Sequence, residues 1–510
     1  MELNFDEKAL EALYIMEKTK QNLFLTGKAG TGKSTLLRSF IANTQKNIAV
    51  LAPTGVAALN IGGSTIHSFF KIGPKSTEKS IKKEAKMFIG DPMFTELDAL
   101  VIDEISMVRA DLFDFINLYL QIVCENKLPF GGKQMILIGD LFQLPPVVTN
   151  EEKAFFREKY PSPYFFSSKV ITNGEFSFTF HELEKIYRQR DPFFIDILNT
   201  IREDLVDQDT LNQLNEQVVS KEKFRLEPGD MYLAGRNSTV DEINQQMLEQ
   251  INEEEELFPA IVKGSMAPSY FPTEEKLVLK VGAQVMFVVN DNAGRRANGT
   301  IGTVKSISRS SVEVTLFDGE TVEVKPYTWR VSQYVYDFDS KKLDSEVMGS
   351  FAQIPLKLAR ACTIHKSQGK TFDKVILDLR GGSFAHGQTY VALSRCKSIK
   401  GLKLTTPILL RDIILDKAVL NFMQQFKGKT FERPVEQLPI YAELEKAIKK
   451  EKKICILYRG KDFEETEREI TPLEMKKIKH QGKVFMGLKA FAHDQDAEKF
   501  FEVRRILGIL

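Results

Sequence analysis

The sequence predicts an α/β protein with two parallel sheets covered by helices, followed by a smaller α+β module. Short apolar runs alternate with amphipathic segments over residues 22–150 and again after residue 183, which is typical of parallel strands joined by helices. A glycine-rich loop also separates the first run from the first helix. The runs of the first set are Asn22–Thr26, Ile48–Ala52, Ala99–Ile102 and Met135–Ile138.

The composition is that of an ordinary globular protein, with 43% hydrophobic and 27% charged residues over 510 positions. The net charge of +1 gives no sign of a nucleic-acid partner, so a surface for one must be a local patch. The scattered cysteines lack a zinc-binding spacing and favour a reducing compartment. With no signal peptide, presequence or membrane-spanning run, we expect a cytoplasmic protein without a membrane partner.

The first strand leads into Gly27-Lys28-Ala29-Gly30-Thr31-Gly32-Lys33-Ser34-Thr35 and then a helix, which is the context of a P-loop. The loop glycines let backbone N–H groups converge on phosphate, and the helix adds its positive end. Lys33 is expected to reach the β- and γ-phosphates, and the Ser34 hydroxyl to ligate Mg²⁺. The predicted nucleotide-binding residues here are Gly27, Gly30, Thr31, Gly32, Lys33, Ser34 and Thr35.

Two further strands end in catalytic candidates. Asp103 and Glu104 follow the third run, where a carboxylate holds Mg²⁺ and a second one activates the attacking water. Gln143 follows the fourth run on a loop stiffened by Pro145 and Pro146, and is predicted to sense the γ-phosphate. A structural turn is the alternative for that loop.

The second run ends in small residues that suit a phosphodiester backbone, namely Thr54 and Gly55. His67, Phe69 and Phe70 follow and are candidates for stacking on bases. Core packing is the better interpretation for at least one of the phenylalanines. Residues 70–96 are then interpreted as a small, lysine-rich helical insertion over the sheet edge.

A second set of apolar runs predicts the second sheet: Met231–Ala234, Val285–Val289, Lys374–Leu379 and Leu402–Leu404. An interruption at 297–355 alternates Val312-Glu313-Val314-Thr315-Leu316 with a turn at Asp318-Gly319, which predicts a small antiparallel barrel. Such an insertion adds a binding surface or serves a structural role.

The second domain supplies its own cleft candidates. Arg188 could contact the nucleotide, although an arginine there is more often in a salt bridge. Thr363, His365 and Lys366 form a polar, cationic loop suited to a DNA backbone, with Gly369 on the nucleotide side. Arg395, expected at a helix start, is the better candidate for an arginine finger.

The predicted domains are 1–182, then 183–296 together with 356–425, the insertion 297–355, and a tail at 437–510. In the tail we expect a helix over Ile440–Lys453, followed by strands at Ile454–Tyr458, Arg468–Ile470 and Lys483–Phe491.

The order GKAGTGKST, APTGVAALNIGGSTIHSF, VIDEISM, GDLFQLPPV, YRQ, TIHKSQGKTFD, YVALSR resembles the superfamily 1B helicases of the petite-integration-frequency, RecD-like type over about residues 1–425. The resemblance implies two RecA-like domains that clamp ATP–Mg²⁺, with Gln143, Arg188 and Arg395 at the γ-phosphate. It also implies a Src-homology-three-like barrel at 297–355 and a wedge-bearing insertion at about 70–96. The residues that it places on single-stranded DNA are Thr54, Gly55, His67, Thr363, His365 and Lys366.

One feature departs from that family. Its members carry a glutamine upstream of the P-loop that reads adenine, whereas this chain has Phe5-Asp6-Glu7-Lys8-Ala9 there. The tail resembles a WYL domain, with Met486-Gly487-Leu488 in place of the eponymous triplet. The combination of the helicase motifs with such a tail suggests a bacterial enzyme. Tyr458, Arg468 and Arg505 are its nucleic-acid candidates; internal pairing of the arginines is the alternative.

The resemblance implies a monomeric 5′-to-3′ DNA helicase that uses ATP and Mg²⁺ in replication, repair, recombination and, in family terms, telomere maintenance. Its expected partners are single-stranded DNA, tailed duplexes and G-quadruplexes, with RNA–DNA hybrids as a further candidate. Two alternatives remain: a single-strand translocase that does not open duplex, and a WYL-based nucleic-acid regulator with an ATPase switch.

Overall fold

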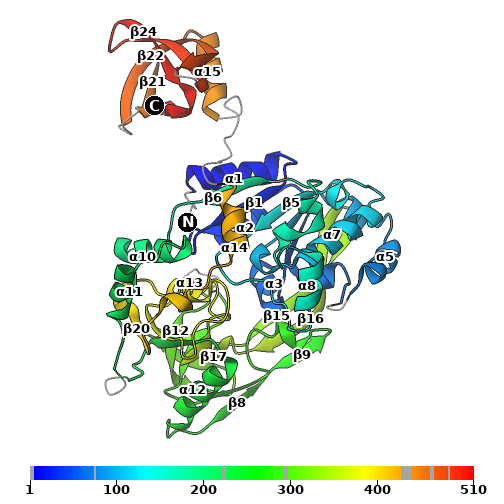
Figure 1. The fold of residues 1–510 in the computed structure, drawn as a ribbon, viewed down its shortest axis with the longest axis vertical. Coiled ribbons are helices and arrows are strands. Elements are labelled where there is room, and N and C mark those ends of the chain that lie inside the picture. Colours follow the sequence, from blue (N-terminus) through cyan, green and yellow to red (C-terminus); the bar gives the residue numbers. More distant parts are fainter. Residues whose placement is uncertain are drawn as a thin grey trace. The chain divides into compact units, whose positions relative to one another are not determined.

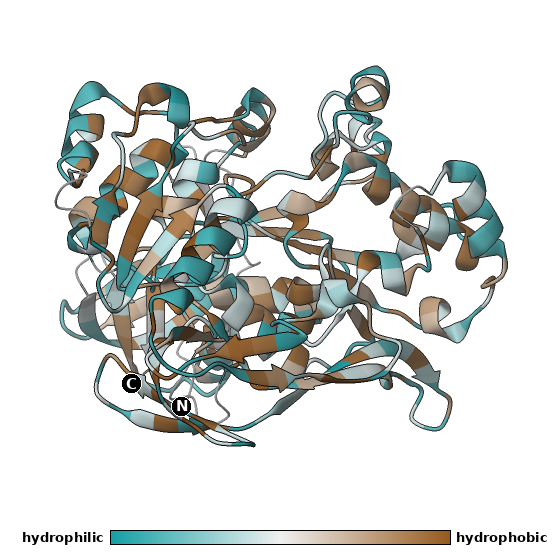
Figure 2. Ribbon diagram, turned by 90° about the horizontal axis from the view of Figure 1, so that it is seen from below, coloured by the Kyte–Doolittle hydropathy of each residue, from teal (hydrophilic) through white to brown (hydrophobic). Residues whose placement is uncertain are grey.

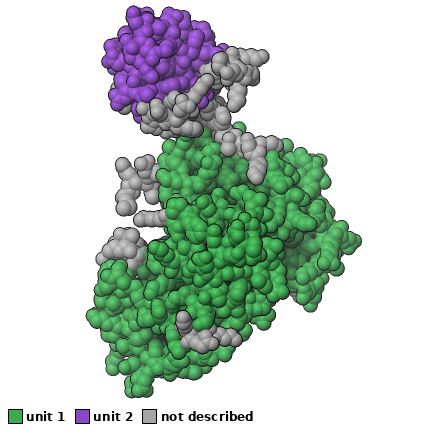
Figure 3. Space-filling view, turned by 60° about the vertical axis from the view of Figure 1, so that its left-hand side comes forward, with its two compact units in different colours: residues 1–430 green, residues 431–510 purple. Residues whose placement is uncertain are grey.

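In the structure, a computed structural model, the chain forms two compact units, Met1–Thr430 and Phe431–Leu510 (Figure 3). The described residues are 5–73, 76–189, 191–220, 225–290, 297–426, 439–459, 465–480 and 483–509.

The first domain of unit 1 contains a six-stranded parallel sheet (Figure 1). The four predicted runs all form strands of it, and the β1, β4 and β5 residues are fully buried, as expected for a parallel sheet covered on both faces. In sheet order the strands are β3 (Ser64–Thr65), β2 (Ile48–Ala52), β4 (Ala99–Ile102), β5 (Gln134–Ile138), β1 (Leu23–Gly27) and β6 (Thr179–Leu183).

Helices cover both faces of this sheet. The first begins after Asp6, whose side chain accepts a hydrogen bond from the Ala9 amide and so caps the helix. The helices in this part of the chain are α1 (Glu7–Lys18), α2 (Lys33–Asn43), α3 (Gly55–Ile61), α4 (Ile66–Phe69), α5 (Glu78–Lys86), α6 (Pro92–Thr95), α7 (Ala110–Val123), α8 (Lys153–Lys159), α9 (Lys169–Thr172), α10 (Pro192–Arg202) and α11 (Gln208–Asn215).

The second domain contains a four-stranded parallel sheet in the order β18 (Ala361–Thr363), β7 (Asp230–Ala234), β19 (Lys374–Asp378) and β20 (Leu402–Leu404). Its helices are α12 (Asn237–Glu249), α13 (Gln388–Leu393) and α14 (Lys417–Gln424). The assignment of Val285–Val289 to this sheet is wrong. That run forms β11 (Gln284–Phe287), which pairs antiparallel with two other strands, because a short apolar run looks the same in either kind of sheet.

The predicted insertion is antiparallel, but its strands form more than one sheet. One sheet has the order β14 (Thr321–Val324), β13 (Val312–Leu316), β12 (Ile301–Ile307), β11 and β17 (Leu356–Leu358). Another has the order β15 (Tyr327–Asp337), β16 (Lys342–Gln353) and β9 (Ile261–Gly264), and β8 (Glu256–Pro259) pairs with β10 (Lys276–Leu279). The hairpin turn at Asp318-Gly319 is confirmed, with Gly319 at φ +93°.

The β15–β16 hairpin docks on the first domain beside strand β2. The Tyr334 hydroxyl accepts a hydrogen bond from the Val50 amide at 2.9 Å. The Ser64 hydroxyl donates to the Ser332 carbonyl at 2.9 Å, and the Asn47 side chain bonds the backbone of the hairpin near its tip. These contacts join a predicted insertion to the edge of the first sheet.

Aromatic residues hold the end of the second domain against the first. Phe422 of α14 stacks on Phe166 with ring centroids 4.2 Å apart, and Phe426 stacks on Phe180 at 4.6 Å. Offset or edge contacts between buried rings stabilise by about 0.5–1.5 kcal/mol beyond their area burial. Hydrophobic residues are concentrated on the strands inside this unit, and hydrophilic ones on the outer helices (Figure 2).

The described residues of unit 2 form an antiparallel sheet accompanied by the helix α15 (Pro439–Lys449). The predicted strand Arg468–Ile470 is the middle of a longer strand. In sheet order the strands are β24 (Ala497–Glu502), β23 (Lys483–Ala492), β22 (Glu465–His480), β21 (Ile454–Arg459) and β25 (Ile506–Ile509). In the described parts of both units, no helix is long and apolar enough to span a membrane.

Candidate active site

The glycine loop between β1 and α2 has the backbone of an anion cradle. Gly30 and Gly32 adopt φ of +84° and +87°, a region that other residues rarely adopt. The Lys33 ammonium donates to the carbonyls of Gly27 at 2.6 Å and Lys28 at 3.1 Å, and its burial lowers its pKa. Ser34 and Thr35 lie exposed on the first turn of α2. The loop therefore brings a cation and a helix N-terminus to one place.

The two carboxylates at the end of β4 lie beside this cradle. The Glu104 amide donates to Asp103 Oδ1 at 3.0 Å. Glu104 has a left-handed backbone, with φ 52° and ψ 44°, which costs a non-glycine residue free energy and is most common at functional sites. Burial raises the pKa of Glu104 to about 7, with Asp103 adding to the effect, and burial also raises the pKa of Asp103. Such a carboxylate is suited to accept a proton near neutral pH.

Gln143 joins this group through a residue that sequence reasoning missed. Its Nε2 donates to Asp140 Oδ2 at 3.0 Å, and its Oε1 accepts from Gln368 Nε2 at 3.2 Å. The same Gln368 amide donates to Glu104 Oε2 at 3.1 Å. Gln368 lies within the cationic loop identified in the sequence, but nothing in the sequence pattern distinguished it from its neighbours.

Two predicted arginines lie near this group: Arg188 follows β6, and Arg395 follows α13 of the second domain. The Cβ of Arg188 lies 2.4 Å from where a Cβ on Gly30 would be, and its Nη2 donates to the Gly369 carbonyl at 3.0 Å. Arg395 is 1% exposed, and burial, with the charge of Arg188, lowers its pKa to about 9. Its guanidinium donates to the Val391 carbonyl at 2.8 Å and to the Lys370 carbonyl at 3.2 Å.

The expected position of Arg395 at a helix start is wrong. Helix α13 ends at Leu393, so Arg395 follows the C-terminus of the helix. The preceding Gly387, at φ +68°, begins the helix instead, and the run Gln388–Leu393 is entirely buried. A helix that is buried on every side shows no amphipathic period, so the sequence did not indicate where this helix begins and ends.

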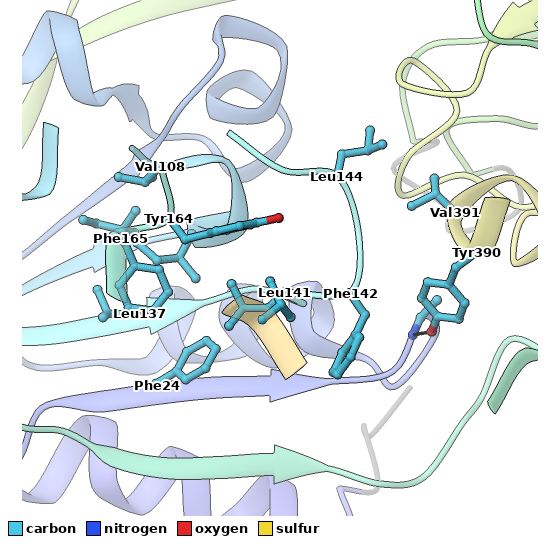
Figure 4. Packing of buried hydrophobic residues seen from close by; sticks show 14 of the residues in the cluster. Phe24, Val108, Leu137, Leu141, Phe142, Leu144, Tyr164, Phe165, Tyr390 and Val391 are labelled. Carbon is cyan, nitrogen blue, oxygen red and sulfur yellow. Dashed lines mark hydrogen bonds between the residues drawn. The ribbon is translucent and has the colours of Figure 1, made fainter. Parts of the chain in front are cut away.

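The second domain also contacts the glycine loop directly. The Tyr390 hydroxyl accepts a hydrogen bond from the Ala29 amide at 3.1 Å, and Figure 4 shows the ring reaching from α13 to the loop after β1. Arg202, on α10, is 4% exposed and lies 3.5 Å from Asp140 and 3.2 Å from Glu182. Neither Tyr390 nor Arg202 was singled out from the sequence, since each is recognisable only from its contacts.

The DNA candidates of the first domain divide into exposed and buried ones. Thr54 is exposed and caps α3, and His67 is half-buried, with its pKa lowered by burial. Gly55 is buried, and a Cβ there would lie 2.9 Å from the Tyr270 ring. The stacking role of Phe69 is wrong: the ring is 5% exposed and packs edge-on against Phe70, Phe94 and Tyr334.

The candidates of the second domain lie on one tight turn after β18. Thr363 is buried, and its hydroxyl accepts a hydrogen bond from the Lys366 amide at 3.2 Å. His365 and Lys366 are exposed. The turn therefore presents a ring and an ammonium outward, while Gln368 points into the cleft.

The candidates of unit 2 are engaged inside that unit. Arg468 forms an ion pair with Asp494, and Arg505 Nε lies 2.9 Å from Glu502 Oε2. Tyr458 packs edge-on against Phe501, with ring centroids 5.2 Å apart. This is the internal pairing that the sequence left as an alternative.

Asp6 and Tyr187 lie near one another, beside the glycine loop. Asp6 caps α1, and burial and the Asp6 charge raise the pKa of the half-exposed Tyr187. The Tyr187 ring lies 3.8 Å from where a Cβ on Gly32 would be, and its amide donates to the Gly30 carbonyl at 2.9 Å. An aromatic face therefore stands at the edge of the phosphate cradle.

Models of two protein families match the chain: PIF1-like helicase over residues 4–204 and WYL domain over residues 439–509. The ATP-dependent DNA helicase Pif1 of Bdellovibrio bacteriovorus is 33% identical over 441 residues, which cover 84% of this chain and 93% of that protein. The human ATP-dependent DNA helicase PIF1 is 34% identical over 421 residues, covering 79% of this chain and 61% of the human protein.

Solved structures give the same result. The structure of Bacteroides sp Pif1 in complex with ADP-AlF4 has 34% sequence identity and a TM-score of 0.75, and the match covers 85% of this chain and 100% of the other. Bacteroides Pif1 bound to ssDNA matches over the same shares, with 35% identity and a TM-score of 0.57.

Proposed function

Since this chain belongs to the PIF1-like helicase family of ATP-hydrolysing DNA helicases, we propose that it moves 5′-to-3′ along single-stranded DNA and opens duplex or structured DNA ahead of it. We further propose that it acts as a monomer in the cytoplasm, in replication, repair and recombination. Forks, tailed duplexes and G-quadruplexes are the proposed substrates, with RNA–DNA hybrids as a further one.

The observation that carries this proposal is that both domains contribute to one catalytic group. Gln368 of the second domain lies 3.1 Å from Glu104 of the first, and Tyr390 bonds the glycine loop at 3.1 Å. A site assembled from two domains changes when they separate, so binding and hydrolysis of ATP can open and close the cleft between them. Candidate DNA contacts lie on both domains, at Thr54 and at Lys366, which supports coupling of that motion to a strand.

Mg²⁺ fits the residues at the cradle. The Ser34 hydroxyl on the first turn of α2 and the Asp103 carboxylate at the end of β4 would hold it, and oxygen ligands are those that Mg²⁺ prefers. When bound, the ion neutralises charge on the β- and γ-phosphates. The chain's own residues then divide the remaining work: Lys33 binds phosphate, Glu104 accepts the proton of the attacking water, and Arg188 and Arg395 stabilise charge on the transferred group.

A strand-displacement assay tests the proposal. Purified protein is given ATP and Mg²⁺ with duplexes that carry a single-stranded tail at the 5′ or the 3′ end. We expect displacement from the 5′-tailed duplex alone. Displacement from the 3′-tailed substrate would contradict the polarity, and ATP hydrolysis on single strands without displacement would favour a translocase that does not unwind.

Lys33→Ala is the control for the nucleotide site. Removing the ammonium leaves the developing phosphate charge without its cation, so we expect hydrolysis and displacement to fall to background. ATP turnover at the wild-type rate would show that Gly27–Thr35 is not the catalytic cradle.

A further inference from the structure

Gln368 crosses from the second domain to the first and contacts two candidate catalytic residues at once. Its Nε2 lies 3.1 Å from Glu104 Oε2 and 3.2 Å from Gln143 Oε1. A carboxamide NH₂ has two protons, so it can donate to both acceptors simultaneously. One side chain of the second domain therefore sets the position of both acceptors.

The two acceptors are anchored on their own side of the cleft. Gln143 Nε2 donates to Asp140 Oδ2 at 3.0 Å, and Asp140 lies 3.5 Å from the buried guanidinium of Arg202. Glu104 is constrained by its left-handed backbone at φ 52°. Because these positions are fixed within the first domain, Gln368 is the member of this group that moves when the second domain moves.

The turn that carries Gln368 is closed by hydrogen bonds among its own residues, 363–368. The Ser367 amide donates to the Thr363 carbonyl at 3.0 Å, and the Gln368 amide to the His365 carbonyl at 3.2 Å. The Ser367 hydroxyl donates to the Ile364 carbonyl at 2.7 Å and is fully buried. A turn closed in this way shifts as one body, so displacement of His365 also displaces Gln368.

The outward side of the same turn has the chemistry of a backbone contact. His365 and Lys366 are both exposed, and Lys366 offers an ammonium that can pair with a phosphodiester. Only Ser367 lies between Lys366 and Gln368, whose side-chain amide contacts Glu104. The turn thus has a side for the DNA strand and a side for catalysis.

We propose that Gln368 is a positioning residue through which single-stranded DNA on the His365–Lys366 side of the turn orients the Glu104 carboxylate for hydrolysis. The inference rests on the proposed function, since it requires that a strand occupies that side. With DNA bound, the turn holds the amide against Glu104 and Gln143 together. Without DNA, nothing on the outer side of the turn holds it in this position, so the amide contacts the carboxylate for a smaller fraction of the time.

The test is steady-state ATP hydrolysis by the full chain over a titration with oligo(dT), in the wild type and three variants. Gln368→Ala removes the amide, and Gln368→Glu keeps the size of the side chain but cannot donate when ionised. Gln245→Ala is the matched control, because the Gln245 Nε2 donates to Glu249 at 2.9 Å on the exposed face of α12.

We expect both Gln368 variants to lower the ratio of DNA-stimulated to unstimulated kcat by about tenfold or more, the scale of one hydrogen bond to a charged group. The KM for ATP and the Kd for oligo(dT), measured by fluorescence anisotropy, stay within about twofold of wild type, since the turn keeps its own backbone bonds. The Gln245→Ala ratio matches the wild type.

Two results would overturn the inference. A stimulation ratio in Gln368→Ala equal to that of the wild type means that the amide transmits nothing. An equal fall of the stimulated and unstimulated kcat means that Gln368 supports the site regardless of DNA. A wild-type enzyme whose hydrolysis ignores oligo(dT) refutes the proposed function itself, and the coupling with it.

Discussion

Phe69 is the residue at which packing decides between two roles. Its ring is 5% exposed and meets Phe70 at 4.9 Å and Phe94 at 5.4 Å between centroids. A ring that fills a core contributes through burial and cavity filling, and it cannot also present a face to a base. Tyr334, on strand β15 of the inserted hairpin, also contacts Phe69, with ring centroids 5.5 Å apart.

Phe69→Ala is therefore expected to destabilise the protein by about 3–5 kcal/mol, the usual cost of truncating a buried aromatic residue. Phe69→Leu, which keeps most of the volume, should cost far less. Urea unfolding followed by fluorescence measures both. A stacking role predicts the opposite pattern, with weaker binding of oligo(dT) at unchanged stability.

Residue identity alone pointed to several members of the candidate catalytic group, whose roles stay predictions, and missed the contacts that join them. Lys33, Asp103 and Gln143 could be identified because each occupies the end of a strand in a recognisable pattern. Gln368 and Arg202 could not, because their significance is a distance to residues more than 50 positions away: Arg202 lies 3.5 Å from Asp140, and Gln368 lies 3.1 Å from Glu104. Tertiary contacts of this kind leave no local signature.

At the scale of elements, α13 shows how tightly the second domain fits the first. Its N-terminal Gly387 has φ +68°, and a Cβ there would lie 2.3 Å from the Phe142 carbonyl oxygen and 2.6 Å from that of Gln143. The absence of a side chain lets the helix approach the loop that carries Gln143. His386 adds to this contact, its Nε2 lying 2.7 Å from the Leu141 carbonyl.

Gly387→Ala is expected to lower DNA-stimulated hydrolysis at least tenfold, because α13 must move away from the Gln143 loop. Gly174→Ala is its matched control: Gly174 has a similar φ of +74°, but nothing lies within 4 Å of its Cβ position. In both variants the left-handed backbone lowers the free energy of unfolding by about 1–2 kcal/mol, because alanine has a Cβ. Rates from a coupled ATPase assay then separate backbone strain from the clash, and equal rates in the two variants would contradict the close fit.

The predictable elements were those with a clear period. Four of the six strands of the first sheet and the 312–324 hairpin were found because burial on both faces, or alternation, is visible in the sequence. Val285–Val289 was misassigned because five apolar residues fit either sheet type. Strand β6 was missed because His181 and Glu182 interrupt its hydrophobic run, although His181 is buried and bonds the Lys8 carbonyl at 2.7 Å.

At the scale of the molecule, the two compact units predict a separable helicase core. Unit 1 contains both parallel sheets and every residue assigned here to ATP, and the ring stacking of Phe422 and Phe426 closes it near its end. The two arginine candidates of unit 2, Arg468 and Arg505, are held in internal ion pairs. ATP hydrolysis is therefore not expected to need unit 2.

A chain ending at Thr430 is thus expected to fold and to retain DNA-stimulated kcat within about twofold of the full chain, since its catalytic contacts are intact. Circular dichroism and the ATPase assay measure the two properties. Loss of stimulation in a truncated chain that still folds would show that the WYL domain takes part in the response to DNA.

The hairpin docked at β2 has a consequence for solubility. Strand β3 has two residues and pairs only with Leu51 and Ala52, so the Val50 backbone lies beyond its reach. The Tyr334 hydroxyl accepts from the Val50 amide at 2.9 Å and thereby covers an unpaired edge, the kind of edge at which strands of different molecules join.

Tyr334→Phe should leave the ring in place and uncover that amide, so light scattering on mild heating should rise sooner than in the wild type. An unchanged onset of scattering would mean that other groups shield the edge. The hairpin thus covers an edge of the parallel sheet, and the Tyr334 phenol is one of the groups through which it does so.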